Sequence, residues 1–149
     1  MYQVTKTYGH ERGLSCAFRQ WKANHSHCSF IHGYALAFTF TFASNELNSC
    51  NWVIDFGGLD WLGETLKNLF DHKLAVAKDD PELEVLSKLH EHNLATVVLF
   101  EKVGCESFAE FMFELVKKKL ETLYPSRSIR IVSVECREHG SNAATYIGE

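Results

Sequence analysis

The sequence predicts an α+β domain in which helices cover one face of an antiparallel sheet. Two periodicities predict this class: apolar residues alternate along several segments and recur at helical spacing along others. In residues 34–43 one face of the expected strand carries only alanines and threonines. The opposite face is large and apolar and consists of Leu36, Phe38, Phe40 and Phe42. We expect helices to bury the large face, whereas the small face suits close packing against another surface.

Four further segments are expected to be strands. Residues 2–8 alternate, residues 94–102 are rich in β-branched and aromatic side chains, and residues 128–138 alternate imperfectly. The short apolar segment 52–56 follows a polar, turn-like stretch and is also expected to be a strand. No repeat or low-complexity linker divides these elements, so residues 1–149 are expected to form one domain.

Three segments are expected to be helices, because their apolar residues recur at helical spacing. They are residues 60–70, a segment that begins at Pro81, and residues 107–123. Asp80 is expected to cap the second helix, with Pro81 in its first position, where an N–H group would be unpaired in any case. With the strands, the order is β-β-β-α-α-β-α-β, which is typical of one sheet covered by helices.

Composition and charge exclude several classes of partner. The formal net charge of −4 provides no basic surface for nucleic acid or an anionic membrane. No apolar run approaches the ~20 residues that cross a bilayer, and the first residues do not have the pattern of a signal peptide. We therefore expect a cytoplasmic protein.

The five cysteines do not suggest a covalent or metal framework. Their number is odd and no export signal precedes them, so a set of disulfides is not expected. No C-x-x-C pair is present, so a zinc site made of thiolates is not expected either. A functional thiol therefore has to be identified from its neighbours.

Polar groups that can carry chemistry gather at three places. Residues 25–34 hold three histidines and a cysteine directly before the clearest strand. The pair Asp71–His72 ends a predicted helix, and the pair Glu138–His139 ends the last predicted strand. Each pattern alone is also typical of a surface carboxylate or of an imidazole with an ordinary packing role. Their functional significance therefore depends on the order in which they occur.

That order matches a known set of motifs. In this chain LSCAF at 14–18 corresponds to the motif F-x-A-A-H, and Cys28 with HGY at 32–34 corresponds to C-x-x-x-H-G-H. NWVIDF at 51–56 corresponds to G-x-x-x-D-F, and FDH at 70–72 to L-D-H. VGCES at 103–107 corresponds to P-T-x-E-N, VECRE at 134–138 to V-x-V-x-E-T, and YIGE at 146–149 to Y-x-G-E. Over nearly its whole length the chain thus resembles the tetrahydropterin synthase family, and within it most closely the 6-carboxytetrahydropterin synthases.

The resemblance implies a tunnelling fold, in which sheets of several subunits assemble into a barrel with the helices outside. It also implies a homo-oligomer, a hexamer made of two stacked trimers, with active sites between subunits. The implied substrate is a pterin, 7,8-dihydroneopterin triphosphate. Cleavage of its C6 side chain would yield 6-carboxytetrahydropterin for queuosine-type synthesis. A 6-pyruvoyltetrahydropterin synthase activity and a non-catalytic pterin- or purine-binding oligomer are the alternatives.

The resemblance also assigns roles to single residues. It makes Cys28 the general acid/base and the pair Asp71–His72 its relay or partner. Glu138 would hold the aminopyrimidine edge of the pterin through two N–H bonds. Cys105 and Glu106 belong to the loop that frames the pterin pocket, and are expected to bind substrate.

The family's zinc site is altered in this chain. Of the three histidine positions, only His32 keeps its histidine, while Phe18 and Tyr34 occupy the others. Phenylalanine cannot coordinate zinc, and a neutral tyrosine is a poor ligand for it. Three hypotheses follow. The first is that a shifted set of ligands is recruited, the second that the chemistry is metal-free, and the third that only binding or assembly is retained. The shifted set would draw on His25 or His27 with His32 and His139.

Overall fold

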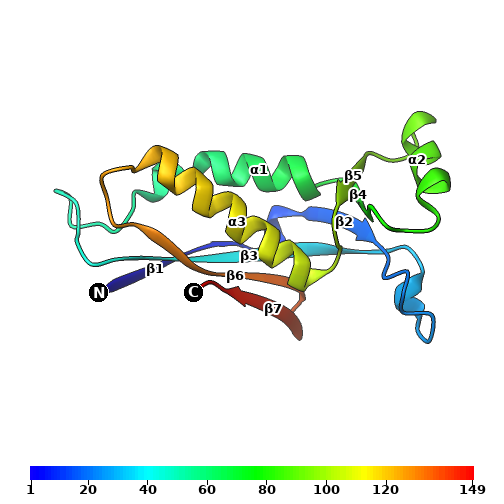
Figure 1. Cartoon of the computed structure of the whole chain (residues 1–149), viewed down its shortest axis with the longest axis horizontal. Helices are drawn as coiled ribbons and strands as arrows, with labels where there is room; N and C mark the ends of the chain where they lie inside the picture. Colours follow the sequence, from blue (N-terminus) through cyan, green and yellow to red (C-terminus); the bar gives the residue numbers. More distant parts are fainter.

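The computed structural model describes residues 1–149 and confirms the α+β class (Figure 1). Its strands are β1 (Tyr2–Tyr8), β2 (Leu14–Phe18), β3 (His32–Ser44), β4 (Lys73–Ala77), β5 (Val97–Phe100), β6 (Arg130–His139) and β7 (Asn142–Ile147). Its helices are α1 (Asp60–Phe70), α2 (Leu83–Glu91) and α3 (Cys105–Leu123), with short 3-10 turns η1 (His10–Arg12), η2 (His27–Ser29) and η3 (Phe56–Leu59). None of the helices is long and apolar enough to span a membrane.

The long strand β3 organises the sheet. Its first half pairs with β2 and its second half with β1, both antiparallel, while β6 pairs along its other edge and carries β7. Beyond β2 the sheet continues through β4 and β5, which run parallel to their neighbours. The predicted antiparallel sheet is therefore confirmed for its main body, and the sheet as a whole is mixed.

The predicted large face of β3 forms the centre of the core. Figure 1 shows α1 and α3 on the same side of the sheet, with α2 set apart beside β4 and β5. The four large side chains of that face are fully buried, as are the facing side chains of the two helices: Leu36, Phe38, Phe40, Phe42, Leu62, Leu66, Phe108 and Met112. The helical and strand periodicities in the sequence thus identified this interface correctly.

Three strands were not predicted, and one predicted strand is absent. β2 is only five residues long, and β4 is buried on both faces, so neither has a long alternating pattern. β7 follows β6 after a tight turn and is mostly exposed. Residues 52–56 form turns instead of a strand. The side chain of Asn48 accepts hydrogen bonds from two backbone amides, and that of Asp55 accepts one from Gly57.

The start of α2 also differs from the prediction. The helix begins at Leu83, its N-cap residue is Glu82, and Pro81 lies in the preceding turn. The Asp80 carboxylate accepts a hydrogen bond from the Glu82 amide at 2.9 Å within that turn. Asp80 therefore stabilises the turn and does not cap the helix, because the N-cap position falls two residues later, at Glu82. Its other hydrogen bonds are with Arg19.

Candidate functional site

The β2–β3 pairing brings the three former histidine positions together. Phe18 is the cross-strand partner of His32, and Tyr34 lies two residues further along β3 on the same face. The ring centroids of Phe18 and His32 are 5.6 Å apart, those of Phe18 and Tyr34 6.1 Å, and those of His32 and Tyr34 5.4 Å. We call these three residues the aromatic cluster. It is held from the core side by Phe108 of α3, whose ring lies 5.4 Å from that of Phe18.

The aromatic cluster does not fit a zinc ion. Phe18 has no donor atom, and the Nδ1 atom of His32 already lies 2.7 Å from the Phe30 carbonyl. Burial and then the charge of Glu138 raise the pKa of the Tyr34 phenol, so this side chain is neutral. Zinc is held by imidazole, thiolate or carboxylate groups, and the cluster offers a single imidazole.

The shifted ligand set is not gathered in the structure either. No three His, Cys, Asp or Glu side chains of the chain are placed to hold one metal ion. His25 and His27 are exposed, and the His27 ring stacks on Phe30. The His139 ring lies 6.0 Å from that of Tyr34, at the edge of the aromatic cluster.

Three of the predicted site residues lie within electrostatic range of Tyr34. After burial, Glu138, Cys28 and Cys105 contribute, in that order, to raising the pKa of its phenol. Cys28 is exposed in η2 and Glu138 is half-buried near the end of β6. The Cys105 thiol is buried at the start of α3 beside Cys136. An accessible thiol and a carboxylate thus lie within electrostatic range of the aromatic cluster.

Asp71 and His72 form a second group at the end of α1. The Nδ1 atom of His72 lies 2.7 Å from the Asp71 carboxylate, which also accepts the Ser15 amide at 3.4 Å. His72 has a left-handed backbone (φ 56°), and its amide donates to the Ser15 carbonyl at 2.7 Å, so β2 fixes the pair. Burial opposes ionisation of Asp71, but the hydrogen bonds from His72 and Ser15 outweigh it and lower the pKa. No hydrogen bond or ion pair joins this pair to Cys28 within one chain.

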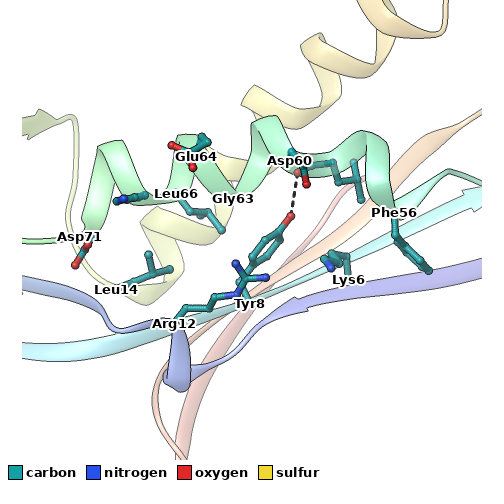
Figure 2. Close-up of a pocket in the computed structure, with 12 residues that line it drawn as sticks. Lys6, Tyr8, Arg12, Leu14, Phe56, Asp60, Gly63, Glu64, Leu66 and Asp71 are labelled. Atoms are coloured by element: carbon teal, nitrogen blue, oxygen red, sulfur yellow. Dashed lines mark hydrogen bonds between the residues drawn. The ribbon is translucent and has the colours of Figure 1, made fainter.

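A cavity of about 530 Å³ lies between β1 and α1 and reaches Asp71. Figure 2 shows Tyr8 at its centre, with Lys6 on one side and Arg12 on the other. The Tyr8 hydroxyl donates to the Leu59 carbonyl at 3.2 Å, and the two cations lie 5.5 and 5.2 Å from the ring centroid. The cavity is of the size that holds small molecules, and it gives Asp71 access to solvent on the helix side of β2.

Glu106 lines a different cavity, of about 600 Å³, beside the start of α3. Gln20 and Val103 line it as well, and Gln20 is a site residue that the sequence patterns did not indicate. Its side chain donates to the Val103 carbonyl at 2.7 Å, and its backbone amide donates to the Cys28 carbonyl at 2.7 Å. Gln20 therefore joins the cysteine segment to the loop before α3. Its position two residues after Phe18 is the only hint in the sequence.

The contact of Gln20 with the loop before α3 requires a glycine at position 104. Its φ of 114° is rarely adopted by residues with a side chain, and a Cβ atom there would collide with the Gln20 amide group. We expect Gly104→Ala to lower the free energy of unfolding by about 1–3 kcal/mol and to displace Gln20. Denaturant unfolding checks this, with Gly140→Ala as the matched control, since a Cβ at Gly140 meets no atom within 4 Å. Equal stability of the two variants would contradict the strain argument.

The fold and the site together define a small α+β protein of the tunnelling-fold class. The model of the 6-pyruvoyl tetrahydropterin synthase family matches residues 8–149, and the chain belongs to that family. Over 97% of both chains it is 24% identical to the 6-carboxy-5,6,7,8-tetrahydropterin synthase of Aquifex aeolicus. These two findings support a lyase-type enzyme.

Solved structures share the fold over nearly the whole chain. An uncharacterized protein from Wolinella succinogenes superposes with a TM-score of 0.83 at 20% identity, covering 99% of this chain and 98% of the other. The 6-pyruvoyl tetrahydropterin synthase of Plasmodium vivax superposes with a TM-score of 0.67 at 14% identity, covering 98% of each. The predicted tunnelling fold is thereby confirmed for the single subunit.

Proposed function

We propose that this protein is a lyase that removes part of the C6 side chain of 7,8-dihydroneopterin triphosphate and yields 6-carboxytetrahydropterin. The observation that carries the proposal is that Cys28 and Glu138 both lie within electrostatic range of Tyr34, in a chain of this family. The relative from Aquifex aeolicus, named for this product, supports the choice over a 6-pyruvoyl product. Use of the product in queuosine synthesis and a cytoplasmic location are part of the proposal.

Each group has a separate task in this reaction. The Glu138 carboxylate accepts two N–H bonds from the aminopyrimidine edge of the pterin and fixes its orientation. The exposed Cys28 thiol then moves a proton at the C6 side chain. Asp71 and His72 act as the second acid/base group. Since no bond joins them to Cys28 within one chain, we propose that a neighbouring subunit of a homohexamer supplies them.

The reaction is proposed to proceed without zinc at the aromatic cluster. With Phe18 in place of one ligand, the cluster offers hydrogen bonds but no metal site. The neutral Tyr34 hydroxyl, near both Cys28 and Glu138, can donate a hydrogen bond to a side-chain oxygen of the substrate. The position that a metal ion takes in relatives with three histidines would thus be taken by a phenol.

The pterin anchor is tested by Glu138→Gln. Loss of the charge removes two charge-assisted hydrogen bonds, so pterin affinity is expected to fall roughly 10- to 100-fold. Equilibrium titration of a dihydropterin, followed by fluorescence, measures the affinity. Glu135→Gln is the matched control, because Glu135 lies on the same strand and pairs with Arg137. If Glu138→Gln folds normally and binds as tightly as the unchanged chain, the anchor assignment is wrong.

A second candidate function is non-catalytic binding of a pterin or purine by the same oligomer. The aromatic cluster favours it, since two of three metal positions no longer hold histidine. In that case binding would still depend on Glu138, but substrate would not be converted, so a turnover assay separates the two functions.

A further inference from the structure

Asp80 is the one buried charged residue in the chain, with 5% of its surface exposed. Its carboxylate accepts hydrogen bonds from Nε of Arg19 at 2.8 Å and from Nη2 at 2.6 Å. These bonds hold the pKa of Asp80 below its ordinary value, so the carboxylate is ionised. Burying an ion pair costs desolvation energy that its mutual attraction often fails to offset. Stability alone therefore does not explain why the Asp80–Arg19 ion pair is buried.

Arg19 continues beyond this pair to the segment that holds Cys28. Its Nη1 atom donates to the Ser29 carbonyl at 3.3 Å, and the next residue, Gln20, donates its amide to the Cys28 carbonyl at 2.7 Å. Two consecutive residues thus bind two consecutive carbonyl groups. A planar guanidinium that is fixed by two bonds to a carboxylate presents its remaining N–H groups in a set direction.

Little else holds that segment. We call residues 26–30 the Cys28 turn. None of the residues 22–31 is buried, so no apolar packing fixes the turn. Inside it, the Ser26 side chain accepts the Cys28 amide at 2.9 Å, which shapes the turn but does not attach it to the sheet. Besides the hydrogen bond between His32 of β3 and the Phe30 carbonyl, the attachment of the turn to the rest of the molecule therefore depends on Arg19 and Gln20.

We propose that the Asp80–Arg19 pair is a positioning device that docks the Cys28 turn against the sheet, and that both residues are positioning residues for Cys28. Asp80 lies in the turn after β4, and orients Arg19, which then holds the Ser29 carbonyl next to the thiol. The catalytic consequence rests on the proposed function of Cys28, whereas the docking itself does not.

Asp80→Asn tests the docking through hydrogen exchange of the Gln20 amide, which donates to the Cys28 carbonyl. With a weakened hold on Arg19, exchange at Gln20 is expected to be about tenfold faster or more, as for loss of a charge-assisted bond. Asp79→Asn is the matched control, because the neighbouring Asp79 is exposed and contacts Lys22 and Trp21 instead. Exchange at Gln20 is expected to be unchanged in that variant.

Turnover supplies the second readout. A displaced thiol is expected to lower kcat roughly 100-fold with KM little changed, since Glu138 still holds the pterin. Arg19→Lys is expected to act in the same way as Asp80→Asn, because lysine keeps the charge but cannot bond two carboxylate oxygens and Ser29 together.

The outcomes separate the two proposals. Unchanged Gln20 exchange in both folded variants would overturn the positioning role. Failure of both variants to fold would also overturn it, since the pair would then support the whole fold. Faster exchange at Gln20 in a protein that shows no turnover before mutation would support the docking and refute the proposed enzyme.

Discussion

Replacing Cys28 with alanine is expected to lower kcat roughly 10²- to 10⁴-fold, while pterin affinity stays close to that of the unchanged chain. The thiol is exposed and, like Glu138, lies within electrostatic range of Tyr34, and in the proposed reaction it moves a proton at the C6 side chain of the pterin that Glu138 holds. Alanine removes the only group of this residue that transfers a proton. It leaves the carboxylate that binds the ring, so catalysis and binding are affected separately.

The control for this variant is Cys50→Ala. Cys50 is the other exposed cysteine and follows Asn48 in a turn outside the site. Single-turnover assays and pterin titration of both variants give the comparison, with substrate conversion followed by chromatography. If Cys28→Ala converts substrate as fast as Cys50→Ala, the thiol is not the acid/base group. If the unchanged chain binds pterin but never converts substrate, the binding function is correct.

Apart from β5, which its β-branched composition indicated, the parts of the fold that the sequence predicted have long, regular patterns. The strand that contains Phe38 and Phe40 alternates over ten residues, and α3 repeats apolar residues over its whole length. Such patterns arise because one face of the element must be buried. β2 and β4 have five residues each, too few for a period to be distinguished. The family motifs pointed to residues in β2, but not to its pairing with β3.

The candidate site was predictable only where a motif named the residue. Cys28, Glu138 and His32 came from the motif order, and the structure places all three near Tyr34. The contacts of Arg19 and Asp80 had no such signal, because they join residues far apart in the sequence. An aspartate before a proline is typical of a helix cap, so local rules gave Asp80 the wrong role. Only the tertiary structure shows a buried partner for it.

Restoring histidine at both altered positions, by Phe18→His with Tyr34→His, is expected to create a zinc site that retains about one ion per chain. Together with His32 the variant presents three imidazoles on one face of the β2–β3 ladder. The three rings are already within 5.4 to 6.1 Å of one another. An ion bound at about 2.0–2.1 Å from each nitrogen would complete its shell with water.

Elemental analysis by plasma mass spectrometry of the purified proteins, before and after incubation with zinc, measures the effect. The unchanged chain is expected to retain none, and Phe18→His alone, with two imidazoles, is expected to hold zinc weakly. Because Phe18 is buried, histidine there is expected to destabilise the fold, and zinc is expected to raise the Tm of the double variant through binding to the native state.

About one zinc per chain in the unchanged protein would refute the metal-free proposal. It would mean that His32 recruits ligands such as His25, His27 or His139 after a rearrangement, since the single subunit does not bring them together.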